Sequence, residues 1–103
     1  MKPIKRITKP TRKVLEALLK SKAGIWGLAL TKEVNLPTGT VYPILGRLEE
    51  LGWVGSFWEA TSDRNGPRRK YYVLKDEATI AAEEIVSEGL EKRVEKIVGV
   101  RHA

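Results

Sequence analysis

Residues 39–53, GTVYPILGRLEELGW, constrain the fold of this chain more than any other stretch. Five apolar residues recur there at spacings of three and four, the spacing of one face of an α-helix: Val41, Ile44, Leu45, Leu48 and Leu51. Gly52 favours a helix end, because glycine readily adopts the left-handed conformation that follows many last turns. From Trp53 the apolar period changes to two. The stretch therefore predicts a helix that leads directly into a β-strand.

The opposite face of this helix carries residues suited to contact with a partner: Thr40, Tyr42, Pro43, Arg47 and Glu50. We expect Thr38 to cap the helix, at an end whose free N–H groups also suit a phosphate. A basic turn, RNGPRRK, follows at residues 64–70. An apolar inner face, an outer face with hydroxyl and arginine groups, and a basic hairpin are together typical of a small DNA-reading module.

The remaining sequence predicts three more helices and a hairpin. Residues 1–9 lack periodicity and are expected to form a mobile basic arm. Further elements are expected as a helix capped by Thr11 and ending near Gly24, a helix over 25–34, strands over 53–60 and 71–74, and a helix over 77–98 capped by Asp76. The fold class is thus mainly α with a β-hairpin, in the order α-α-α-β-β-α.

The last predicted helix, over residues 77–98, is about 33 Å long at 1.5 Å per residue. It is too long to pack wholly against so small a body, so part of its apolar stripe would stay exposed on a monomer. Pairing with a second copy is the simplest remedy. The expected dimer interface comprises Ile85, Val86, Leu90, Val94 and Ile97.

Composition excludes several classes of function. The chain has no cysteine and a single histidine, His102, next to its end, so we expect no metal, no cofactor and no enzymatic activity. No membrane span or secretory signal is visible, which fits a cytoplasmic protein. The net charge is +6, and residues 1–22 hold eight Lys/Arg against Glu16 alone. This basic front suits a polyanion, although it also suits plain solubility.

Two strings occur in order, Gly-Thr-x-Tyr-Pro-x-Leu at 39–45 and Gly-Pro-Arg-x-x-Tyr-Tyr at 66–72. With Trp26-Gly27 and Leu51-Gly52-Trp53-Val54, they make the chain resemble the PadR family of winged helix-turn-helix transcriptional regulators over about residues 14–75. The resemblance implies a single domain, 1–103, with a DNA-binding core over 10–75 and a dimerisation helix over 76–100. It also implies a homodimer that binds an operator, usually as a repressor. The family often has Thr-x-x-Gly where this chain has residues 75–78, which alters how the last helix begins.

The candidate DNA-binding residues are Thr38, Thr40, Tyr42, Pro43, Arg47, Arg64, Arg68, Arg69 and Lys70. Each has an alternative role: Tyr42 could pack between helices, Arg47 could pair with Glu49 or Glu50, and the basic turn could merely be solvated. The Trp residues and the Tyr71-Tyr72 pair are expected in the core or an interface. The alternative function is a winged-helix protein-interaction module, which would not need four bases in one turn. The sequence does not identify an effector.

Overall fold

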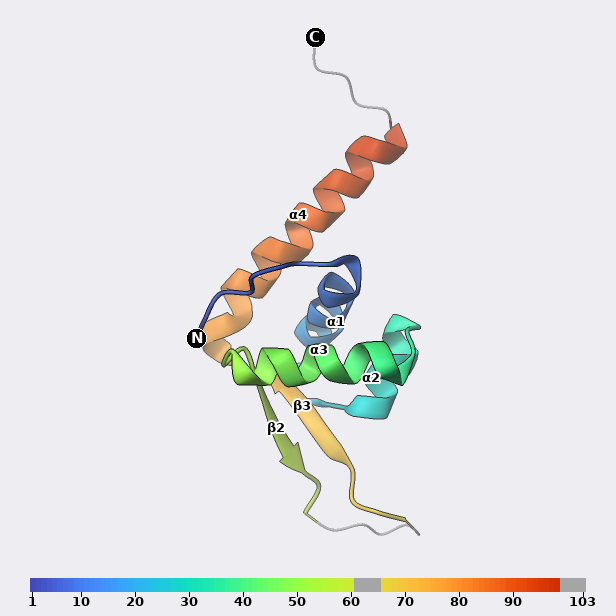
Figure 1. Cartoon of the computed structure of the whole chain (residues 1–103), viewed down its shortest axis with the longest axis vertical. Coiled ribbons are helices and arrows are strands. Elements are labelled where there is room, and N and C mark those ends of the chain that lie inside the picture. Colours follow the sequence, from blue (N-terminus) through green and yellow to red (C-terminus); the bar gives the residue numbers. More distant parts are fainter. Residues whose placement is uncertain (61–65, 99–103) are drawn as a thin grey trace.

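The computed structural model describes the backbone of residues 1–60 and 66–98, and side chains of the last helix as far as Leu90. Three helices and a small sheet form one body, from which the last helix projects (Figure 1). The elements are α1 (Lys9–Lys20), β1 (Ile25–Trp26), α2 (Gly27–Val34), α3 (Thr38–Glu50), β2 (Val54–Trp58), β3 (Lys70–Leu74), a 3₁₀ turn η1 (Asp76–Ala78) and α4 (Thr79–Val98). The predicted class, mainly helical with a β wing, is confirmed.

The core lies between α1, α2, α3 and the inner face of the sheet. Its fully buried side chains come from all of these elements: Val14, Leu15, Leu18, Leu30, Val41, Leu45, Leu48 and Val54. The buried residues of α3 are those that the three-and-four spacing predicted, apart from Leu51, which is half-buried. Packing of this apolar stripe fixes which face of α3 remains outside.

The sheet has three antiparallel strands in the order β1-β3-β2. The hairpin was predicted, but the third strand was not, because Ile25 and Trp26 were assigned to the start of the second helix. They pair instead with Tyr72 and Tyr71. A β-branched and an aromatic residue suit a strand, and their pairing covers an edge of β3 that a two-stranded hairpin would leave open.

Three predicted helix caps are wrong by a few residues. The cap of α1 is Thr8, whose hydroxyl accepts from the Thr11 N–H at 3.3 Å. Thr38 is the first residue of α3 rather than its cap, since Pro37 occupies the cap position without a side-chain hydrogen bond. Asp76 begins η1, and Lys75 precedes that turn in extended conformation. The departure from the family pattern at residues 75–78 thus coincides with a tight turn before α4.

The end of α3 follows the prediction. Gly52 has φ +84°, its N–H donates to the Glu49 carbonyl, and the Trp53 N–H donates to the Leu48 carbonyl at 2.9 Å. These two bonds satisfy carbonyls that the last helical turn would leave unpaired. The chain therefore passes from helix to strand within three residues, Leu51 to Trp53.

The N-terminal segment, residues 1–8, is held against the body, which corrects the expectation of a mobile arm. The Lys2 N–H donates to the Leu51 carbonyl at 2.8 Å, and the Trp53 indole donates to the Lys2 carbonyl at 2.6 Å. Ile4 and Ile7 are half-buried against the core. The segment runs above α3 to reach α1 (Figure 1).

Helix α4 begins against α1 and then extends beyond the body (Figure 1). Ala82 and Ile85 are buried in the chain's own core, so Ile85 offers little surface to a second copy. Val86 is half-buried, whereas 53% of Leu90 is exposed. The side chains of Val94 and Ile97 lie outside the described residues.

Candidate nucleic-acid interface

The outer face of α3 carries no packing from the rest of the described chain along its centre. An ideal Cβ built at Gly39 or at Gly46 meets no heavy atom within 4 Å. Pro43 lies between these two glycines on the helix surface and is exposed, as are Thr38 and Arg47, while Thr40 is half-buried. A helix with so smooth an outer face can approach a partner surface closely.

Tyr42 lies at the edge of this face, packed against the chain on one side and exposed on the other. Its side chain is 38% exposed. Its ring rests on Gly27 at the start of α2, where an ideal Cβ would lie 2.8 Å from the Tyr42 hydroxyl. The ring also meets Tyr72 edge-on, with centroids 6.5 Å apart. Tyr42 is therefore braced by two elements while part of it stays accessible.

A polar contact joins α3 to the sheet behind Tyr42. The Ser56 hydroxyl donates to Glu49 Oε2 at 2.5 Å, which ties the last turn of α3 to β2. Burial raises the pKa of the neighbouring Tyr72 hydroxyl above its ordinary value, and Tyr42 and Glu49 raise it further. Tyr72 thus stays neutral at physiological pH and supports Tyr42 as a packing surface.

Arg47 is available for a partner. Glu49 is engaged by Ser56, and no ion pair links Arg47 to Glu50. Within residues 1–60 and 66–90, the ion pair found is the exposed one between Lys20 and Glu16, at 3.4 Å. Arg47 lies beside the N-terminal segment, on the flank of α3 away from Tyr42.

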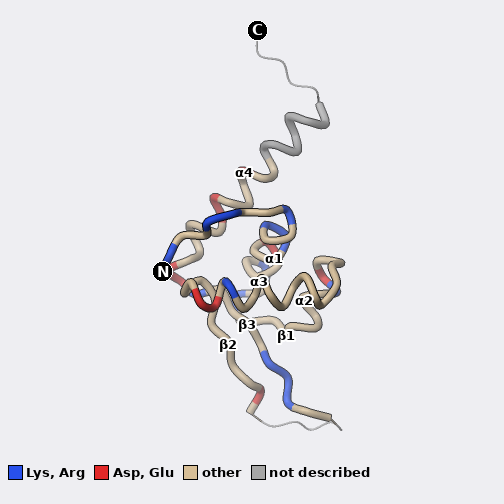
Figure 2. Tube along the Cα trace, viewed as in Figure 1, with Lys and Arg blue, Asp and Glu red and all other residues tan. Residues whose placement is uncertain are grey.

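The basic residues on the returning arm of the wing differ in how far their side chains are engaged within the chain. Figure 2 shows a basic segment just before and at the start of β3. Arg68 is exposed, but the Arg69 guanidinium lies over the Trp26 ring, 4.0 Å from its centroid. The Lys70 ammonium lies 5.5 Å from the Tyr72 ring centroid. Arg64, the fourth predicted base, lies outside the described residues.

Two backbone-centred hydrogen bonds close the wing at the level of Arg69. The Arg69 N–H donates to Glu59 Oε1, and the Glu59 N–H donates to the Arg69 carbonyl, both at 2.9 Å. Together with the stacking on Trp26, they fix the direction in which Arg69 leaves the strand. Arg69 is therefore held in one orientation before any partner binds.

The aromatic residues of the sheet do not all lie in the core. Trp53 and Tyr72 are buried as expected, whereas Trp58 is 60% exposed. The Lys70 ammonium lies 5.8 Å from the Trp58 ring centroid. Alternation along β2 places Trp58 on the face of Val54, but it falls beyond the region that α3 covers. Whether Trp58 is buried depends on how far the covering helix reaches along β2, and the alternation within the strand does not encode that length.

The sequence profile described as the Transcriptional regulator PadR-like family matches residues 14–84, more than half of the chain. The chain belongs to this family. Its members are DNA-binding transcriptional regulators with a winged helix and not enzymes. No curated protein matched the sequence.

Solved structures agree with the family. A PadR family transcription regulator from Clostridium difficile R20291 is 26% identical, with 87% of this chain and 98% of that chain covered and a TM-score of 0.66. The MepR–DNA complex of S. aureus has a TM-score of 0.75 at 20% identity, and the match covers 93% of this chain and 67% of the MepR chain. NadR in complex with 4-hydroxyphenylacetate has a TM-score of 0.64 at 22% identity. The match covers 89% of this chain and 63% of the NadR chain. The last two likenesses concern the fold.

In the winged helix-turn-helix order, α3 follows α2 as the second helix of the helix-turn-helix, and β2 and β3 form the wing hairpin. The predicted residues of α3 and of the wing base lie on these two elements, as the resemblance implied. None of the helices in the described part of the chain combines the length and apolarity needed to cross a membrane.

Proposed function

We propose that this PadR-like regulator is a repressor that acts in the cytoplasm and binds a pseudo-palindromic operator as a homodimer. The observation that carries the proposal is the bare centre of the outer face of α3. The braced Tyr42 lies on one side of it, and on the other lies Arg47, which has no ion-pair partner among the described residues. A surface that is held rigid, and whose centre no other described residue covers, is suited to an external partner.

Tyr42 is the principal groove contact in this proposal. It lies in the N-terminal half of the recognition helix, the half that normally enters the major groove. Its exposed edge offers a hydroxyl for a phosphate or base edge and a ring for a thymine methyl. Thr38 and Thr40 position the backbone, and Pro43 lies at the groove surface.

In this proposal the basic residues of the wing contact DNA phosphates and do not read the identity of the nucleobases. Arg68 is exposed, and Lys70 and Arg69 are held by aromatic rings near it. Such contacts contribute affinity and salt dependence without sequence information. Arg64 is assigned the same role from the sequence alone.

A second copy completes the binding unit. Helix α4 extends past the body and exposes Leu90, while the sequence continues the stripe with Val94 and Ile97. Val86 adjoins this stripe, and Ile85 contributes by supporting α4 from within. Two copies joined along α4 would place their α3 helices in major grooves about 34 Å apart.

Footprinting on the DNA upstream of the protein's own gene tests this proposal, since small repressors often regulate themselves. We expect protection of two half-sites one helical turn apart. Tyr42→Ala should abolish protection while the protein remains folded, and Tyr42→Phe should retain part of it. Lys20→Ala is the control, because it alters an exposed side chain on α1 outside the proposed interface. Undiminished protection by Tyr42→Ala would show that Tyr42 serves packing alone.

A further inference from the structure

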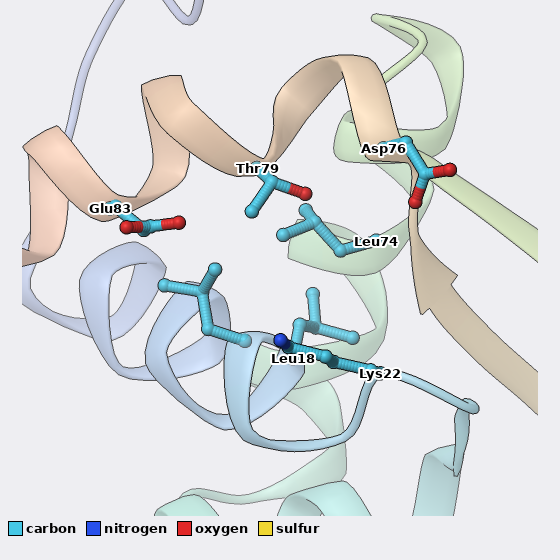
Figure 3. A pocket seen from close by; sticks show the side chains of 7 residues that line it. Leu18, Lys22, Leu74, Asp76, Thr79 and Glu83 are labelled. Atoms are coloured by element: carbon cyan, nitrogen blue, oxygen red, sulfur yellow. The ribbon is translucent and has the colours of Figure 1, made fainter.

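Two surface hollows of the described chain differ in charge. The hollow between α1 and the start of α4 sets leucines beside both Lys22 and Asp76, so its lining carries both signs (Figure 3). The hollow between the N-terminal segment and α3 is different, because Lys5, Arg6 and Arg47 line it and no acid does. Positive charge is thus concentrated along one flank of α3.

The N-terminal segment that borders this second hollow is basic along its length. The first acidic residue of the chain is Glu16, whereas four exposed cations come before it: Lys2, Lys5, Arg6 and Lys9. None of these four takes part in an ion pair among the residues whose side chains are described. Their charge is therefore available to an external polyanion.

The segment lies with its apolar side chains toward the body and its cations outward. Ile4 and Ile7 are half-buried against the core, while Lys5 and Arg6, which lie between them in the sequence, are exposed. Burial of the two isoleucines thus decides which side of the segment carries the charge.

Both ends of the segment are fastened to the body. The Lys2 N–H donates to the Leu51 carbonyl and the Trp53 indole donates to the Lys2 carbonyl, which holds the first residues beside the end of α3. The cap at Thr8 fixes the other end where α1 begins. The cations between these two points therefore keep a defined position next to α3.

The basic elements of the chain lie on opposite flanks of α3. Tyr42 marks the flank toward the sheet, because its ring meets Tyr72 of β3, the strand whose start carries the basic residues of the wing. Arg47 marks the other flank, where it shares the hollow with Lys5 and Arg6. Figure 2 shows basic positions on the N-terminal segment, on one side of α3, and at the start of β3, on the other.

The dimensions of B-DNA give both flanks a partner. An α-helix with its side chains is about 10–12 Å across, and the major groove is about 12 Å wide. A helix inside the groove therefore lies close to the phosphates of both strands, with one strand along each wall. The wing can reach the phosphates on the Tyr42 side of α3, which leaves the opposite wall beside Arg47.

We propose that the N-terminal segment binds this opposite wall, with Lys5, Arg6 and Arg47 contacting phosphates of the strand that the wing does not contact. The inference rests on the proposed function and extends it, since the recognition helix would be held from both sides. Lys2 and Lys9 continue the positive track at either end of the segment. Phosphate contacts on both walls fix the position of α3 in the groove and add no base preference of their own.

The salt dependence of binding to a random-sequence duplex tests whether the segment contacts phosphates. The double variant Lys5→Gln/Arg6→Gln should flatten the slope of log K against log salt by about 1.8, because each lost phosphate contact removes about 0.9. The charge-conserving double variant Lys5→Arg/Arg6→Lys should keep the slope of the parent. Both residues are exposed, so folding should be preserved, and circular dichroism checks this.

The double variant Lys20→Gln/Lys22→Gln is the matched control. It removes the same charge from exposed positions at the other end of α1 and should bind the duplex with the slope of the parent. An unchanged slope for Lys5→Gln/Arg6→Gln would overturn the proposal. So would an equal flattening in both double variants, since it would show a response to net charge alone.

Ethylation interference on the upstream DNA tests which strand the segment contacts. An ethyl group on a phosphate removes its charge, so binding weakens wherever the protein needs that phosphate. Within each half-site the parent should show interference on both walls of the major groove. Lys5→Gln/Arg6→Gln should lose the interference on one strand, and Arg68→Ala should lose it on the other. Loss at the same phosphates in both variants would refute the assignment of the segment to the opposite wall.

Failure of the proposed function would be recognised separately. A parent protein that binds upstream and random DNA equally well would contradict operator binding. The slopes measured on the random duplex would still decide whether the N-terminal segment contacts phosphates, because that measurement requires no operator.

Discussion

Replacing Gly46 by alanine should change stability and DNA binding in opposite directions. Gly46 lies inside α3, and an ideal Cβ there meets nothing within 4 Å, so alanine fits without strain. Glycine in a helix interior is about 1 kcal/mol less favourable than alanine. The free energy of unfolding should therefore rise by about that amount, and a domain of this size should melt about 4–8 °C higher.

The same methyl group should impair the proposed DNA contact. It would project from the centre of the smooth outer face, beside Pro43 and between the flanks of Tyr42 and Arg47. A recognition helix kept from its closest approach loses several contacts together, so we expect at least tenfold weaker binding to the operator. Thermal unfolding at matched protein concentration measures the first effect, and fluorescence anisotropy with labelled upstream DNA measures the second.

Gly27→Ala is the contrasting control. Its Cβ would lie 2.8 Å from the Tyr42 hydroxyl, so this change should lower stability rather than raise it. If Gly46→Ala binds DNA as tightly as the parent, the outer face of α3 does not closely approach DNA, and the reasoning fails. A fall in melting temperature for Gly46→Ala would show instead that the outer face packs against another part of the protein.

Three further results are expected. Arg68→Ala should flatten the dependence of log K on log salt by about 0.9 if one phosphate contact is lost, whereas Lys20→Ala should not; an altered base preference with an unchanged slope would contradict this role. Because the pKa of Tyr72 is raised in the folded protein, stability should fall as the pH rises past the unfolded value of about 10, and Tyr72→Phe should reduce this fall, as urea titrations at pH 9 to 11 would show. Leu90→Glu should weaken dimerisation in sedimentation equilibrium, since burying a leucine contributes about 1.5–3 kcal/mol; an unchanged association constant would exclude Leu90 from the interface.

The sequence predicted the elements whose signals are local and repeated. The three-and-four spacing from Val41 to Leu48 identified the buried face of α3, and Gly52 identified its end. Both depend on the chain's own geometry, since an apolar stripe must be buried and a positive φ favours glycine. The exposed face of α3 followed from the buried one, so the positions of the candidate contacts on that face could be predicted, while their roles stay predictions.

The errors occurred where a distant segment decides the local structure. Ile25 and Trp26 adopt a strand because β3 offers a free edge, and only the folded chain brings Tyr71 and Tyr72 beside them. The N-terminal segment has no periodicity of its own, yet Leu51 and Trp53 hold it through hydrogen bonds. Ile85 and Leu90 both belong to the predicted stripe, yet Ile85 is buried in the chain's own core and Leu90 is 53% exposed. Periodicity states that a face is apolar and leaves open which partner covers it.

Tyr42 shows how such distant contacts bear on function. From the sequence its two roles, packing and DNA contact, exclude each other, because one side chain was assumed to face one way. In the structure Gly27 and Tyr72 hold the ring from behind while its edge stays exposed. Tyr72 is in turn buried beside Glu49, which Ser56 fixes. Packing thus lowers the conformational entropy that Tyr42 would lose on binding, so its structural role strengthens the proposed role in DNA contact.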